Sequence, residues 1–79
     1  MERDIKKWIE REYLNTKIYG DGLSTRHAID RCYGAFMFVI NEILDYDSDE
    51  SQRLIFWWEN EILPKFNQLL DWQNKINTL

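Results

Sequence analysis

The 79-residue chain has one cysteine, one histidine, one proline and three glycines. A single cysteine excludes a disulfide within the chain, and one histidine beside it leaves a tetrahedral zinc site short of ligands. The N-terminus lacks the apolar run of an export signal, and no stretch approaches the roughly 20 apolar residues of a membrane span. These absences indicate a cytoplasmic protein without a membrane partner.

Positive charge is scarce in the second half of the chain. The formal net charge is −4, which disfavours direct binding to nucleic acid. Seven acidic side chains between residues 42 and 61 face a single basic residue, Arg53; they are Glu42, Asp45, Asp47, Asp49, Glu50, Glu59 and Glu61. We call this segment the acidic corner. It is typical of a solvated surface, and it could also meet a basic groove on another protein.

Apolar and aromatic residues are plentiful, at 44% and 15% of the chain. Their spacing is helical, and two turn-forming segments, 19–22 and 45–49, divide the chain into three parts. Gly20 suits a left-handed position after a helix end. We therefore expect one all-α domain over 1–79, a self-associating three-helix up-down-up bundle. Its predicted helices cover about 3–18, 25–45 and 49–76.

Apolar stripes define the predicted core. The first helix carries Leu14 and Ile18 away from its apolar face, so its last turn is expected to unwind or fold back. The second helix is expected to start at an N-cap of Ser24 or Thr25. Its core positions are Ile29, Cys32, Phe36, Val39, Ile40 and Ile43.

The third helix is predicted to begin at an N-cap of Asp47 or Ser48, with Asp47 and Glu50 forming a pair that resembles a capping box. Pro64 removes a backbone donor and clashes one turn back, which predicts a kink near residues 60–63. Two apolar columns line this helix. The first holds Ile55, Trp58, Ile62, Phe66, Leu69 and Ile76, and the second holds Phe56, Leu63 and Leu70.

Two aromatic residues fall outside these stripes. Plotted at about 100° per residue, Phe38 lies opposite the core stripe of the second helix, and Gly34 opens a notch one turn before it. Trp57 points away from Trp58 on the third helix. The first helix could cover one of the two aromatics, but covering both is harder. We interpret Gly34, Phe38 and Trp57 as part of a partner interface.

The remaining motifs do not support catalysis or a cofactor. His27 and Cys32 are five residues apart, about 140° around a helix, so they are not a catalytic pair. The sequence Asp45-x-Asp47-x-Asp49-x-Ser51 matches half a calcium loop, but Glu50 replaces its obligatory glycine and Phe56 its bidentate glutamate. The preferred hypothesis is a non-catalytic protein–protein interaction module whose partner includes a second copy, as in a homodimer. The first alternative is an inhibitor or decoy that binds a basic groove through residues 42–61, with Asp45, Asp47, Asp49 and Glu50 in contact. The second alternative is a weak calcium-binding protein.

Overall fold

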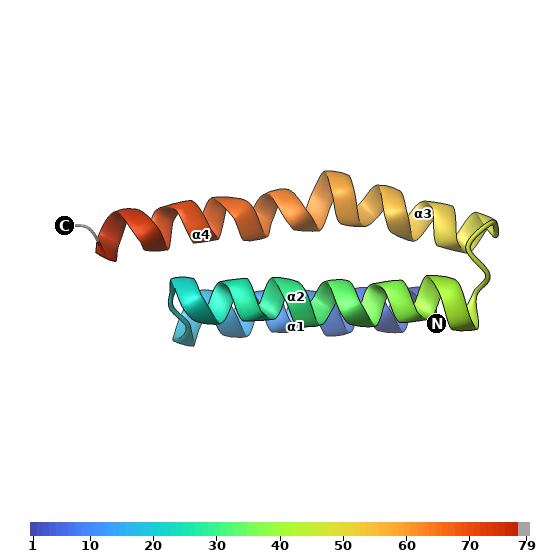
Figure 1. Ribbon diagram of the computed structural model, residues 1–79, viewed down its shortest axis with the longest axis horizontal. Helices are drawn as coiled ribbons and strands as arrows, with labels where there is room; N and C mark the ends of the chain where they lie inside the picture. Colours follow the sequence, from blue (N-terminus) through green and yellow to red (C-terminus); the bar gives the residue numbers. More distant parts are fainter. Residues whose placement is uncertain (78–79) are drawn as a thin grey trace.

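In a computed structural model, the protein is an all-helical molecule with extents of 46 × 18 × 16 Å. The structure describes residues 1–77. Figure 1 shows three rods lying along one another, with the chain reversing direction at each of two connections. The first rod is α1 (Glu2–Tyr19), and the second joins α2 (Gly22–Phe38) to the π-helical segment η1 (Val39–Ile43). The third rod joins α3 (Asp49–Trp57), the π-helical segment η2 (Trp58–Ile62) and α4 (Leu63–Asn77).

Helix α1 is continuous through its last turn, so the expected unwinding at Leu14 and Ile18 is wrong. Both side chains are exposed on the outer side of the rod. Gly20 follows the helix with φ −97° and ψ 174°, an extended conformation and not the predicted left-handed one. A Cβ at Gly20 would lie 2.8 Å from the carbonyl oxygen of Thr16. Close approach to the backbone, and not a positive φ, therefore makes glycine necessary here.

Helix α2 begins three residues earlier than predicted because its N-cap is Asp21, and not Ser24 or Thr25. The Asp21 carboxylate accepts a hydrogen bond from the Ser24 amide at 2.8 Å. Thr25 is fully buried and bonds to Gln73 of α4, while the Gln73 amide reaches the carbonyl oxygen of Gly20 at 3.4 Å. The residue expected to cap a helix therefore joins two rods instead.

The core lies between the three rods, where α1 and α4 both pack on α2 and α3 packs on α1. Phe36 and Trp58 stack with ring centroids 5.4 Å apart, and Tyr13 meets Phe66 edge to face at 5.3 Å. Burial of these aromatic side chains is the main favourable term in the fold, about 25 cal/mol for each Å² of apolar surface removed from water. The fully buried large side chains include Ile9, Ile40, Leu54, Ile62 and Phe66.

Two π-helical segments change which residues face this core. In η2 the Leu63 amide bonds to the carbonyl oxygen of Trp58, five residues back, so one extra residue enters the turn. One inserted residue rotates the following face by about 100°. Pro64, which has no amide hydrogen to donate, then lies in the first turn of α4.

Most of the first predicted column is confirmed, because Trp58, Ile62, Phe66 and Leu69 are buried. Phe56 and Ile76 are exposed, although the sequence places them in the core columns. Ser51, Leu54 and Trp57 of α3 and Gln73 of α4 are buried without having been predicted. In η1 the Leu44 amide likewise bonds to the carbonyl oxygen of Val39 at 2.9 Å. Ile43 is therefore exposed, although the sequence predicts it to be buried.

Candidate interaction surfaces

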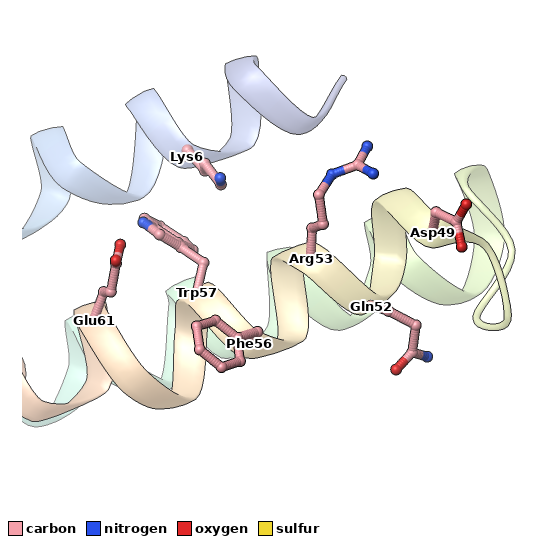
Figure 2. Close-up of a pocket in the computed structure, with 7 residues that line it drawn as sticks. All are labelled: Lys6, Asp49, Gln52, Arg53, Phe56, Trp57 and Glu61. Carbon is pink, nitrogen blue, oxygen red and sulfur yellow. The ribbon is translucent and has the colours of Figure 1, made fainter.

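A groove of about 550 Å³ lies between the N-terminal half of α1 and the α3–η2 part of the third rod (Figure 2). Trp57 and Phe56 provide its apolar part, and the charged lining consists of Lys6, Asp49, Arg53 and Glu61, with Gln52 between them. We call it the α1–α3 groove. Its volume is in the range of ligand and peptide sites, and it is open to solvent along its length.

Trp57 is buried, with 7% of its surface exposed, so the predicted outward orientation is wrong. The Lys6 ammonium lies 5.6 Å from the centroid of the Trp57 ring, and both residues belong to the groove. Helix α1 thus covers the ring, which is the case considered above in which the first helix hides one of the two aromatic side chains. Trp57 remains a lining residue of a candidate surface, but not as an exposed aromatic side chain.

An ion-pair cluster fixes the rim of the α1–α3 groove. The Arg53 guanidinium donates to both carboxylate oxygens of Glu2, at 3.3 and 3.1 Å, and the Lys6 ammonium lies 3.5 Å from Glu2. Hydrogen bonding from Arg53 lowers the pKa of Glu2, and the same contact raises the pKa of Arg53. The groups are solvent-exposed enough that this cluster orients side chains more than it stabilises the fold.

Phe56 is 65% exposed at the edge of the same groove. Figure 2 shows its ring in front of the α3 ribbon, below Trp57, which extends toward α1. The sequence places Phe56 in a core column, so pattern reading misses it as a surface residue. No local sequence signal distinguishes it, because its exposure depends on how α1 and α2 pack on the third rod.

Phe38 is 59% exposed on the outer face of the second rod, as its position opposite the core stripe predicts. Gly34, one turn earlier, is exposed, and a Cβ built there meets no described atom within 4 Å. This part of the surface is therefore open to an approaching helix. Trp57 lies on the groove between α1 and α3, so the structure does not join Phe38 and Trp57 into one patch.

The structure divides the acidic corner: Glu59 and Glu61 lie in η2, and its other five residues lie at or beside the connection between η1 and α3. Asp45, Asp47, Asp49 and Glu50 are all exposed, and Asp45 has a left-handed φ of 71°. Ser48 caps α3 by accepting a hydrogen bond from the Ser51 amide at 3.1 Å, and the buried Ser51 hydroxyl donates to the Asp45 carbonyl oxygen at 2.6 Å. Of the two predicted N-caps, Ser48 is therefore the one that is used, and the predicted pair of Asp47 and Glu50 does not form the cap.

The residues that match half a calcium loop form hydrogen bonds with one another. Ser51, which occupies the seventh loop position, is buried and points its hydroxyl at the backbone. Among residues 1–77 there is no group of three or more His, Cys, Asp or Glu side chains that could hold a metal ion. Within the same residues, no helix is long and apolar enough to cross a membrane.

Cys32 and His27 lie in different surroundings. Cys32 is fully buried, and its burial raises the thiol pKa to about 12. His27 is exposed, in a shallow depression of about 290 Å³ with Glu12 and Arg31. A thiol held protonated in the core does not act as a nucleophile near neutral pH.

A second groove, of about 330 Å³, runs along the opposite side of α3, between it and α2. Tyr33 and Tyr46 border it and are about half exposed, above the stacked rings of Phe36 and Trp58. The Tyr33 ring lies 6.0 Å from the Trp58 ring, centroid to centroid. Sequence reasoning did not select this groove, because its residues lie on the flanks of two core stripes.

Compared with known proteins, the chain matches no family model, no curated protein and no solved structure. Its function is therefore argued from the surfaces described above.

Proposed function

We propose that the protein is a non-catalytic, cytoplasmic interaction module that binds other proteins, including a second copy of itself, through exposed side chains of a three-helix bundle. In this proposal the three rods form an up-down-up arrangement with a bend near Pro64. The supporting observation is the exposure of Phe38 and Phe56, each more than half accessible on the outer face of a rod. Aromatic side chains dominate interface energetics, and on a small soluble protein their exposure marks contact surfaces.

The length of the chain supports the proposal that the protein self-associates. A domain of this size buries only about 60% of the surface that its unfolded chain exposes, so its core supplies little stability. Within one chain no disulfide can form, since Cys32 is the only cysteine. Oligomerisation is the usual remaining supplement for a small scaffold.

Analytical ultracentrifugation tests this proposal. We expect the apparent mass to rise with concentration, and the double variant Phe38→Asp with Phe56→Asp to stay monomeric because both exposed aromatic faces are lost. A matched control, Asn41→Asp with Asn67→Asp, adds the same charge at two exposed polar positions and should associate like the wild type. A wild-type chain that remains monomeric at millimolar concentration contradicts the self-association.

The second candidate is an inhibitor or decoy that presents the acidic corner to a basic groove on another protein. One observation favours it: Arg53, the only basic side chain between residues 42 and 61, is held by Glu2 of α1. The Glu2 carboxylate offsets the positive charge of Arg53, so the acidic corner keeps a negative field that attracts a basic surface.

Partner capture separates the two candidates. The variant Asp47→Asn, Asp49→Asn and Glu50→Gln removes three exposed charges and keeps side-chain size. If the acidic corner binds a partner, the variant with three charges removed no longer captures the partner. The double variant Phe38→Asp with Phe56→Asp still captures it. Equal capture by the charge-neutral variant and the wild type contradicts the decoy function.

A further inference from the structure

An exposed aromatic side chain lies beside a groove on one face of the third rod. Phe56 projects into solvent, and the α1–α3 groove next to it has about 550 Å³ of space with Trp57 on its inner side. Figure 2 shows both features on the same face. A projection beside a recess can be matched by an identical copy, because a two-fold axis sets each projection against the other recess.

The charged residues along this face are also arranged so that a two-fold axis would place opposite charges against each other. Arg53 and Glu61 lie four residues before and four residues after Trp57, and all three line the α1–α3 groove. At about 1.5 Å per residue, Arg53 is about 6 Å along the rod from the tryptophan, and Glu61 is slightly nearer because the chain reaches it through the π-helical segment η2. Rotation by 180° about an axis near Trp57 brings each position close to the other.

We infer that the α1–α3 groove is an isologous interface between two copies of this chain, in which the α3–η2 segments pair antiparallel about a two-fold axis near Trp57. Arg53 of each copy then faces Glu61 of the other, and the Phe56 ring of each copy enters the other groove. This inference rests on the self-association in the proposed function and identifies the face that carries it.

Both charged groups are available for such a contact. Glu2 binds Nε and one Nη atom of Arg53, and a guanidinium has five N–H groups, so donors remain. Glu61 is exposed, and within residues 1–77 no cation lies within ion-pair distance of it. An unrelated partner would have to supply the opposite charge at both ends of the groove, whereas a second copy already does so.

Charge reversal tests the pairing directly. Arg53→Glu and Glu61→Arg each place like charges opposite one another twice in the dimer, and we expect each to raise the dimer dissociation constant about tenfold or more. Glu61→Arg is the cleaner variant, because Arg53→Glu also loses the contact with Glu2. Glu59→Arg is the matched control, since Glu59 borders the opposite groove and the same charge change there should leave association unaltered.

Mixing the two single variants is the decisive measurement. A one-to-one mixture of Arg53→Glu and Glu61→Arg chains restores both ion pairs, so sedimentation should show a heterodimer although each variant alone is monomeric. The chain that carries both changes should dimerise with itself. If the wild type dimerises while both single variants match Glu59→Arg, the pairing is wrong and the proposed self-association still stands. If the wild type is monomeric throughout, the self-association itself is wrong.

Discussion

The two ends of the molecule are closed by different kinds of hydrogen bond. At the end where α1 turns into α2, Gln73 of α4 bonds to Thr25 and to the Gly20 carbonyl, residues 48 and 53 positions away in the chain. At the end where η1 turns into α3, the Ser51 hydroxyl bonds to the Asp45 carbonyl only six positions away. We call them the turn end and the acidic end.

The hydrogen bonds at the two ends therefore differ in whether they need the rods to be packed. The bonds of the acidic end form between neighbours in sequence, so they can organise the start of α3 before the rods pack. The two Gln73 bonds of the turn end exist only when α4 lies against α2, whereas the Asp21 cap beside them is local. We therefore expect substitutions at the turn end to cost more than substitutions at the acidic end, and four predictions test this.

The largest effect is expected for Thr25→Val at the turn end. The valine keeps the shape but leaves the buried side-chain oxygen of Gln73 without its donor, which should lower the free energy of unfolding by about 2–3 kcal/mol. Adding Gln73→Leu removes the unpaired oxygen and also the donor to the Gly20 carbonyl, so it should recover part of the loss. Urea denaturation followed by circular dichroism gives both values, and a double variant as unstable as Thr25→Val would show that the bond is not the cause.

Gly20→Ala compared with Gly22→Ala is the second test of the turn end. A Cβ at Gly20 meets the Thr16 backbone oxygen at 2.8 Å, which cannot move without bending α1, so a loss of about 1–2 kcal/mol is expected. A Cβ at Gly22 meets only the Asn74 amide oxygen at 2.9 Å, and that side chain is free to rotate. Thermal melting should place Gly22→Ala near the wild type and Gly20→Ala below it. Equal melting temperatures would contradict this reading of the turn.

A smaller effect is expected for Ser48→Ala at the acidic end. The substitution removes the side-chain oxygen that caps α3, and N-cap losses are typically about 1 kcal/mol. Ser48→Thr keeps the hydroxyl, which also donates to the Asp45 carbonyl oxygen, and should behave like the wild type. Hydrogen exchange at the Ser51 amide reports the cap directly. Unchanged exchange in Ser48→Ala would mean that the amide is protected by other means.

The smallest effect, of opposite sign, is expected at Asp45. Its φ of 71° strains any residue with a Cβ, although aspartate tolerates this region better than most, so Asp45→Gly should stabilise the protein by about 0.5 kcal/mol. Asp45→Asn removes the charge without changing the backbone preference and serves as the control. A destabilised glycine variant would indicate that the carboxylate, which accepts from the Asp47 amide at 3.5 Å, matters more than the strain.

The helices could be predicted from the sequence, whereas their phase could not. Apolar spacing locates α1, α2 and the third rod because each buries one continuous face. It misplaces Ile43 and Ile76, which lie within or after a π-helical segment that adds a residue to a turn. It also misplaces Phe56 and Trp57, because their burial depends on which side of α3 the helix α1 covers. Phe38 is placed correctly, since it precedes η1 and keeps the phase of α2.

Of the candidate surfaces, one could likewise be predicted from the sequence and one could not. The acidic corner is visible in the sequence, because seven carboxylates within twenty residues are a property of composition. The α1–α3 groove is not, because it needs Lys6 and Trp57, fifty-one positions apart, to meet across two rods.

The sequence by itself determined the helical class, the three segments, the charge asymmetry and the exposed Phe38, all of which follow from local spacing and composition. Only the tertiary structure decided that Trp57 is covered while Phe56 is exposed, and that Thr25 binds α4. The physical reason is that burial depends on the rotation of each rod about its axis. That rotation is set by the packing between the rods and by the two π-helical segments. Neither can be read from a helical period of 3.6 residues.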